Sequence, residues 1–282
     1  MIQQKNTQHQ APGSVICIHL IIPPLKTQIP LIPMKFMSLF LRIFSHFILI
    51  LLLTTGIVLP VCAQNHIDGE VRVAGAMKNV MWKGEIEGII KMDSLARPGM
   101  YGIGPLESLA GELMLFDGVP YYSFVGHDSF MLVDYDPERL APFFVYAEVR
   151  EWKQIPIPDS VLTVPALEHF LDSYASGYSD PFAFWLEGAV DSAAFHIQNL
   201  PAGTVIRSPE DAHTGQVTYV NDWYEVDLLG FFSRNHQGIF THHDTYIHVH
   251  LLTKNREGMG HLEKAHWAPG AMRLYVPAHT FN

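Results

Sequence analysis

The chain has 282 residues, with 18 basic and 28 acidic side chains and a formal net charge of −10 at pH 7. A surface that binds nucleic acid would show clustered lysine and arginine, so this balance argues against a nucleic-acid partner. Chemistry on a small molecule is the class of function that the composition favours.

The first quarter of the chain has the layout of an export signal. Residues 47–61 are apolar and uncharged, they follow Lys35 and Arg42, and Ala63 offers a small residue at the expected cut. The apolar run is shorter than the ~20 residues that a membrane-spanning helix needs, which favours cleavage over the alternative of a membrane anchor. We therefore predict an exported protein, periplasmic or secreted.

The export signal also sets the predicted domains. We expect an overlong N-terminal extension over residues 1–33, the signal peptide over 34–63 and one mature domain over 64–282. Both cysteines, Cys17 and Cys62, precede the mature domain, so no disulfide can stabilise it. The mature domain is expected to leave the membrane unless Cys62 carries a lipid.

The mature domain begins with signals for short strands. Residues 65–98 contain alternating stretches broken by glycines, which are typical of short strands or a mixed region. Strand-like runs over 113–116 and 121–125 flank Asp117-Gly118, a strong turn signal, and predict a hairpin. A further strand is expected over 143–149.

The next segment predicts a helix over residues 164–174, because its apolar side chains recur at helical spacing and Gly177 follows its end. Strands are then expected over 181–188, 216–220, 230–234, 238–241, 245–253 and 271–276, with a short helix around 222–229. Many strands with few helices predict an α+β, mainly β fold. We expect mixed and antiparallel sheets in two closely packed lobes.

Three histidines on a predicted C-terminal β-hairpin form the candidate metal site. His248 and His250 are two residues apart on a strand and therefore point to the same face. Residues 254–258 form a polar turn, so His261 on the returning strand can lie opposite the pair. Three imidazoles give the arrangement that leaves a position of Zn2+, or another divalent ion, open for water or substrate. The alternative is a chance pattern in a chain with 16 histidines.

The hairpin and a segment upstream resemble the α-acetolactate decarboxylase family. Residues 246–262 are similar to the family's metal-binding hairpin, a His-x-His pair followed by a polar turn and Gly-Gly-His, with Gly258-Met259-Gly260 here in place of the glycine pair. Residues 101–104, 109–112 and 116–118 are similar to its Gly-hydrophobic-Gly, Leu-Asp-Gly-Glu and Asp-Gly run, and residues 181–184 and 187–188 match more loosely. The resemblance covers the mature domain from residue 68 to residue 277.

The resemblance implies a carboxy-lyase that decarboxylates α-acetolactate to acetoin. It implies that His248, His250 and His261 hold the metal ion, which acts as a Lewis acid for the enediolate left when carbon dioxide departs. Glu112 falls on the glutamate of the family's hairpin, and this position implies that it orients the substrate or relays a proton.

The chain departs from the family pattern at two places. Gln198 stands where the family has an arginine that contacts the substrate, and glutamine supplies no fixed charge. Arg207, a few residues on, is the other candidate for that contact, although its place before Ser208-Pro209 is more typical of a solvated loop arginine. The family also uses a carboxylate beyond the third histidine, and Glu263 is the last acid in this chain.

Other functions stay open at this point. A related lyase for another 2-hydroxy-3-oxo acid, or an exported non-catalytic metal- or ligand-binding domain, would fit the same scaffold, and a homodimer is among the open oligomeric states. A cupin also carries a His-x-His pair, but Lys254 and Asn255 occupy the places where it needs a glutamate. His242 and His243 either donate hydrogen bonds to the metal-binding histidines or lie at the surface. Residues 266–267 and His279 are expected at the surface.

Overall fold

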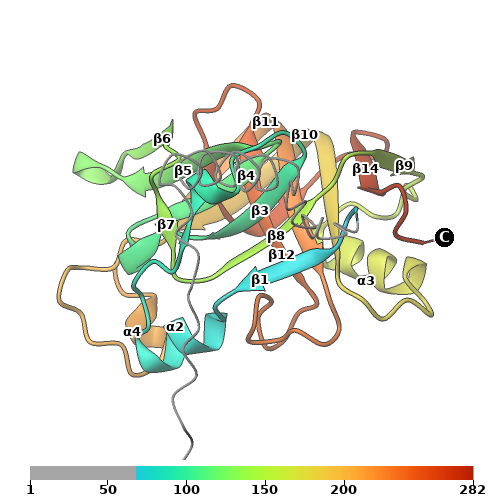
Figure 1. Cartoon of the computed structure of the whole chain (residues 1–282). Helices are drawn as coiled ribbons and strands as arrows, with labels where there is room; N and C mark the ends of the chain where they lie inside the picture. Colours follow the sequence, from blue (N-terminus) through green and yellow to red (C-terminus); the bar gives the residue numbers. More distant parts are fainter. Residues whose placement is uncertain (1–67, 282) are drawn as a thin grey trace, which may run out of the picture. The chain divides into compact units, whose positions relative to one another are not determined.

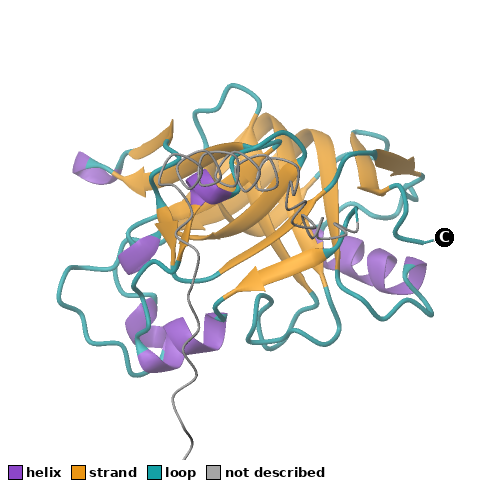
Figure 2. Cartoon of the chain, in the orientation of Figure 1, coloured by secondary structure: helices purple, strands orange, loops and turns teal. Residues whose placement is uncertain are grey.

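The computed structural model describes residues 68–281, so the predicted extension over 1–33 and the signal peptide over 34–63 lie outside the described residues. Within residues 68–281 no helix is both long and apolar enough to cross a bilayer. The described residues form mainly β-structure with few helices (Figures 1 and 2), as the sequence predicts.

The first sheet has six strands in the order β1-β8-β3-β4-β5-β6, and each neighbouring pair is antiparallel. The strands are β1 (Val71–Ala74), β3 (Met100–Pro105), β4 (Glu112–Phe116), β5 (Val119–Val125), β6 (Met131–Tyr135) and β8 (Phe144–Glu148). The predicted hairpin is confirmed as β4 and β5. Asp117 and Gly118 both have positive φ, 50° and 79°, as the tight turn of a two-residue hairpin requires.

The second sheet has the order β11-β12-β13-β10-β14-β9, and β10 also pairs with β11, so four of its strands close on themselves. The strands are β9 (Trp152–Ile155), β10 (Phe182–Ile197), β11 (Val217–Phe232), β12 (Ile247–Thr253), β13 (Met259–His266) and β14 (Met272–Pro277). A small separate pair joins β2 (Ile90–Lys91) to β7 (Leu140–Ala141). All the strand pairs of the described residues are antiparallel, which corrects the expectation of mixed sheets.

Three α-helices lie outside the sheets: α2 (Met77–Lys83), α3 (Val164–Tyr174) and α4 (Pro209–Ala212). Short 3-10 turns cover η1 (Met92–Ser94), η2 (Glu107–Leu109) and η3 (His127–Ser129). Helix α3 confirms the predicted helix, and Thr163 caps its start by accepting a hydrogen bond from Ala166 N at 3.3 Å. Helix α2 was not predicted; it contacts α4, and Figure 1 shows the two side by side.

Three further expectations were wrong. Residues 238–241 form no strand, because they lie in a turn that an isolated bridge between Gln237 and Thr241 closes. Residues 222–229 form no helix, because they belong to β11 and pair with β10 and, beyond Glu225, also with β12. Trp267 is not at the surface: it is 1% exposed, and its indole Nε1 donates to Val161 O at 2.7 Å. The Trp267 ring packs in the core under α3, where a large apolar side chain is worth most.

Alternating side chains of β12 pack into two different hydrophobic clusters. Ile247, Val249 and Leu251 point into the core that the second sheet shares with α3. Leu252 points the other way, into a buried cluster with Ile103 of β3. This cluster joins the two sheets face to face, as two packed lobes, and every residue of β12 is buried. Residues at even positions of β12 therefore face the first sheet.

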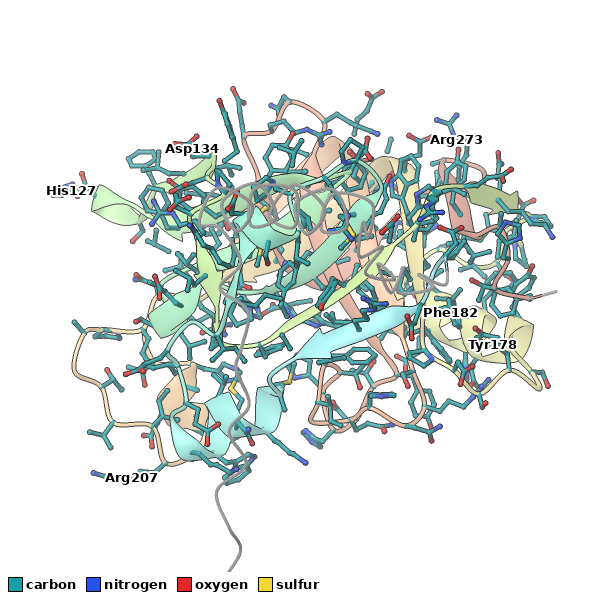
Figure 3. All side chains as sticks on the ribbon, viewed as in Figure 1. His127, Asp134, Tyr178, Phe182, Arg207 and Arg273 are labelled. Atoms are coloured by element: carbon teal, nitrogen blue, oxygen red, sulfur yellow. The ribbon has the colours of Figure 1, made fainter. Side chains whose placement is uncertain are left out.

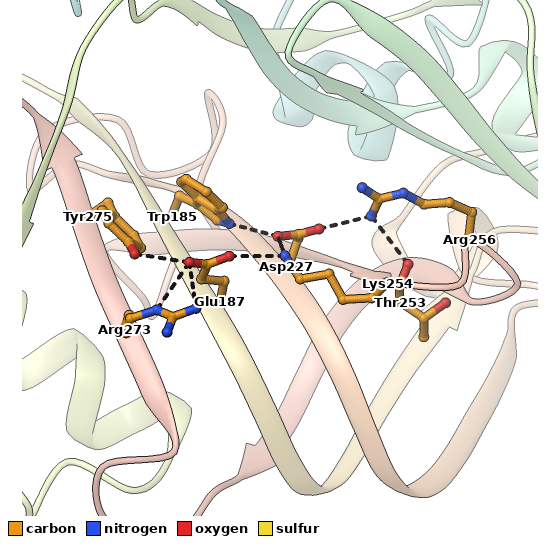
Figure 4. A network of polar contacts seen from close by, with 8 residues as sticks. All are labelled: Trp185, Glu187, Asp227, Thr253, Lys254, Arg256, Arg273 and Tyr275. Atoms are coloured by element: carbon orange, nitrogen blue, oxygen red, sulfur yellow. Dashed lines mark hydrogen bonds and ion pairs between the residues drawn. The ribbon is translucent and has the colours of Figure 1, made fainter.

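A buried carboxylate anchors the turn after β12. Asp227 of β11 is fully buried and accepts hydrogen bonds from Trp185 Nε1 at 3.0 Å, Lys254 Nζ at 2.6 Å and Arg256 Nη1 at 2.9 Å (Figure 4). A buried carboxylate is stable only when its oxygens are paired in this way. The contact holds residues 254–258 against β10 and β11.

Glu187 of β10 extends the same network to β14. It accepts hydrogen bonds from Arg273 Nη2 and Tyr275 OH, both at 2.9 Å, and from Lys254 Nζ at 3.1 Å (Figure 4). Burial raises the pKa of Glu187, but the three donors outweigh it, so the net pKa lies below its ordinary value. The carboxylate is therefore ionised near neutral pH.

Candidate metal centre

The register of the C-terminal hairpin brings the three predicted histidines together. His250 of β12 pairs directly with His261 of β13, and His248 lies two residues earlier on the same face. One ring nitrogen of each lies within 4.8 Å of the others, and His248 Nε2 is 3.1 Å from His261 Nδ1. The predicted hairpin geometry is confirmed.

Burial keeps the three imidazoles in the neutral, ligand form. His248 is 2% exposed and His250 is fully buried. Burial, with a smaller effect from His196, lowers the pKa of His250 to about 3, and burial also lowers the pKa values of His248 and His261 well below the usual range. Because a metal binds the neutral imidazole, the site carries ligands rather than three cations near neutral pH.

The donor set fits a divalent metal ion. His250 Nε2 is buried without a hydrogen-bond partner among the described residues, and a buried polar atom of this kind indicates a missing partner. The adjoining cavity of about 20 Å3 has room for one water-sized species. Three histidines with a free side are the ligand set of catalytic zinc sites.

Glu112, at the start of β4, faces this site from the first sheet. Its Oε2 lies 3.7 Å from His250 Nε2, and the residue is 2% exposed. Burial raises the pKa of Glu112 well above its ordinary value, opposed by a hydrogen bond that Gln198 N donates to Oε1 at 3.1 Å. The structure therefore brings Glu112, the glutamate that the resemblance indicates, beside the three histidines.

Gln198 follows the end of β10 and lines the same cavity. It is 4% exposed, and its Nε2 donates to Gln216 Oε1 at 3.4 Å. The remaining amide oxygen, Oε1, is buried without a partner among the described residues. Gln198, which stands where the family has an arginine, thus lies beside Glu112 but brings no charge to the cavity.

The structure does not bring Arg207 to the histidines. Arg207 is exposed, in the loop between β10 and α4, and Figure 3 shows its side chain pointing away from the sheets. Its backbone N donates to Asp211 Oδ2 at 2.9 Å, at the start of α4. Arg207 is not among the residues that line the cavity.

Sequence reasoning missed His196 as a neighbour of the site. Its ring is parallel to that of His261, with centroids 4.6 Å apart and an interplanar angle of 17°, and its Nδ1 is 3.0 Å from Glu263 Oε1. The signal was present in the sequence, since His196 lies near the end of a strand, two residues before Gln198. Glu263 thus reaches the site through His196.

Two more histidines and an apolar wall complete the cavity. The His242 ring centroid is 5.2 Å from that of His261, which makes His242 a neighbour of the ligands, while His243 is exposed. His213 lines the cavity from the residue after α4. The apolar lining residues are Met77 and Met81 of α2 with Pro105, Leu109 and Phe143. The ligands are thus closed off from solvent on one side by α2.

Comparison with protein families and structures gives one family. A family model described as alpha-acetolactate decarboxylase matches residues 74–279, which include the whole candidate site. No curated protein sequence matches the chain significantly.

Solved structures share the fold at low identity. Alpha-acetolactate decarboxylase from Bacillus subtilis strain 168 has a TM-score of 0.61 and 18% identity, over 73% of this chain and 84% of that chain. A Staphylococcus aureus protein of unknown function, similar to the same enzyme, has a TM-score of 0.59 and 15% identity, over 73% and 84%. At this identity the likeness shows the fold alone.

Proposed function

This chain belongs to the α-acetolactate decarboxylase family, and we propose that it is a metal-dependent carboxy-lyase that converts α-acetolactate to acetoin and carbon dioxide. The observation that carries the proposal is the convergence of His248, His250 and His261, whose ligand atoms lie within 4.8 Å of one another. Zinc is the ion that three neutral imidazoles with a free side suit best.

The reaction needs charge stabilisation and one proton. The bond between the carboxylate carbon and the carbinol carbon breaks, its electron pair moves toward the keto oxygen, and the carbinol carbon then takes up a proton. A divalent ion at the three histidines supplies Lewis-acid stabilisation of that oxygen. The protein must supply the remaining steps, which are substrate orientation and the placement of the proton.

Glu112 is the side chain to which we assign the proton step. It lies 3.7 Å from His250 Nε2 and is fixed by the hydrogen bond from Gln198 N, so it can orient the substrate or pass it a proton. Met77 and Phe143 add apolar surface to the lining of the cavity, and electrostatic interactions are stronger in less polar surroundings.

Acetoin formation tests the proposal. The purified protein is loaded with zinc and mixed with α-acetolactate, and acetoin is measured with and without a chelator. We expect acetoin to form well above the spontaneous rate, and the chelator to remove the excess. Zinc binding without turnover would overturn the proposal. It would favour a non-catalytic ligand-binding domain, in keeping with the glutamine at position 198 where the family has an arginine. Turnover of another 2-hydroxy-3-oxo acid, without turnover of α-acetolactate, would identify the protein as a related lyase.

Export belongs to the same proposal. The apolar run over residues 47–61 and the small residue Ala63 support removal of a signal peptide. N-terminal sequencing of the protein isolated from the periplasm or medium should find the chain starting near residue 64. An intact N-terminus in a membrane fraction would contradict cleavage.

A further inference from the structure

The cavity at the metal-binding histidines, the histidine cavity, meets solvent beside three of its lining residues. His213, His242 and His261 are partly exposed, whereas the other residues that line it are buried. His213 directly follows α4, and His242 lies in the loop between β11 and β12. The metal-binding histidines are therefore approached from solvent between α4 and this loop.

A second cavity lies outside the histidine cavity at this place. It has a volume of about 150 Å3 and is lined by residues of α2, by Pro209 and by the same loop, and we call it the outer recess. Met77, Met81, His213 and His242 line both cavities. These four side chains therefore form the wall between the outer recess and the metal-binding histidines.

The wall has to move before a substrate can pass. The histidine cavity, of about 20 Å3, has room for a water-sized species, whereas a five-carbon acid is several times larger. Met77 and Met81 have unbranched, flexible side chains. Helix α2, which carries both, lies between Gly75 and Gly84, with φ of 68° and 67°, and residues at the ends of an element can act as hinges. The side of the wall that α2 forms is thus the part suited to open.

The outer recess carries an unpaired cation. Of the described residues that line the two cavities, Lys78 alone is a lysine or an arginine. Lys78 is exposed, and within residues 68–281 its ammonium has no hydrogen bond or ion pair. The chain as a whole has a net charge of −10, so a local positive charge favours the approach of an anion at this place. Trp82, which is 61% exposed, adds apolar surface to the same recess.

We propose that the outer recess is the entrance of the site and binds a small carboxylate anion, its carboxylate at Lys78 and its alkyl group against Trp82, before Met77 and Met81 move to admit it. The inference rests on the proposed function, since the anion is taken to be a 2-hydroxy-3-oxo acid. Lys78 acts before the chemical step and is a positioning residue, so its loss lowers kcat/KM and leaves kcat unchanged.

Protection of an introduced thiol tests the entrance without turnover. Met81→Cys places a thiol in the wall, and its reaction with a neutral methanethiosulfonate is followed by mass spectrometry of the peptide that contains residue 81. α-Hydroxyisobutyrate should slow the reaction, and its uncharged amide should not. The test is run with and without zinc, which separates binding in the recess from binding at the metal.

Two lysines of α2 give the variant and its matched control. In the Met81→Cys background, Lys78→Gln should raise the half-protecting concentration of α-hydroxyisobutyrate by about twofold to sixfold, the effect of one unit charge at about 4 to 10 Å in water. Lys83 lines neither cavity and already faces Glu85 at 3.8 Å, so Lys83→Gln should leave that concentration unchanged. The same factor is expected in kcat/KM for α-acetolactate, and added salt should shrink it.

The outcomes separate this inference from the proposed function. Equal half-protecting concentrations in Lys78→Gln and Lys83→Gln overturn the inference even when the protein forms acetoin, as does a fall of kcat in Lys78→Gln as large as the fall of kcat/KM. A rise in Lys78→Gln alone, in a protein that forms no acetoin, supports the entrance and contradicts the decarboxylase proposal. Trp82→Cys, at an exposed position in the same recess, carries the labelling test should Met81→Cys fail to fold.

Discussion

Gly260 lies directly against the backbone of His196: a β-carbon at residue 260 would come within 2.5 Å of the His196 carbonyl oxygen and 2.7 Å of Phe195 Cδ2. The residue before the third histidine must therefore lack a side chain for β13 to pair closely with β10. This contact sets the distance between the His196 and His261 rings.

The substitution Gly260→Ala should displace His261. We expect it to lower the free energy of unfolding by about 1 to 3 kcal/mol, as overpacking of a close contact does, and to weaken zinc binding. Urea unfolding and a competition titration with a chromophoric chelator measure the two effects. Gly203→Ala, where a side chain would meet no neighbour but the φ of 82° strains any residue other than glycine, should lose stability and yet keep its zinc affinity. Equal zinc affinity in both variants would contradict this role of Gly260.

Glu112→Gln should impair turnover without emptying the metal site. Glutamine keeps the size of the side chain and an acceptor for Gln198 N, but it cannot deliver a proton. Loss of a general acid lowers rates by at least about 100-fold, so we expect kcat for acetoin formation to fall by about that factor at unchanged zinc content. Glu87→Gln, at an exposed position, serves as the control. A wild-type kcat for Glu112→Gln would remove Glu112 from the reaction.

Asp227→Ala should destabilise the second sheet. The change removes the acceptor for Trp185 and leaves Lys254 and Arg256 without their buried partner, although both are about one-third exposed and can rehydrate. We expect a loss of about 2 kcal/mol in the free energy of unfolding. Glu138→Ala, which removes an exposed ion pair with Lys91, should cost far less, because solvent screens an exposed pair. Equal losses of unfolding free energy in the two variants would show that the buried contacts of Asp227 stabilise the fold no more than an exposed ion pair does.

Glu187 should contribute to acid unfolding. Its pKa in the folded protein is lowered, so its contribution to stability is present above the ordinary pKa of 4.5 and is lost as the pH falls through the folded-state pKa. Glu187→Gln should therefore be less stable than the wild type at about pH 7, with the difference shrinking as the pH falls below 4.5. Urea unfolding at several pH values measures this. A constant difference across the range would contradict the assignment.

Local patterns carried the predictions that succeeded. The hairpin of residues 112–125 follows from two strand-like runs around Asp117-Gly118, and the metal hairpin from His248, His250 and a turn short enough to fix the register of His261. In each case the partners are close in sequence, so spacing alone determines which side chains meet.

The predictions failed where a structure depends on the pairing of strands that are far apart in the sequence. His196 and Glu263 are 67 residues apart, and their contact depends on how β10 pairs with β13. The helix expected around 222–229 was wrong because long-range pairing of β11 with β10 overrides its local spacing. In α2, Met77, Val80 and Met81 are buried at helical spacing, but the glycines around this short segment obscured the period.

Zinc content is the most direct measure of the central claim, that three histidines of one hairpin hold one metal ion. Elemental analysis should find about one zinc per chain in the wild type and in His169→Ala, whose histidine is exposed on α3. His250→Gln, which fills most of the vacated space, should retain only a small fraction of that content while keeping its fold by circular dichroism. A full zinc complement in folded His250→Gln would contradict the assignment of the site.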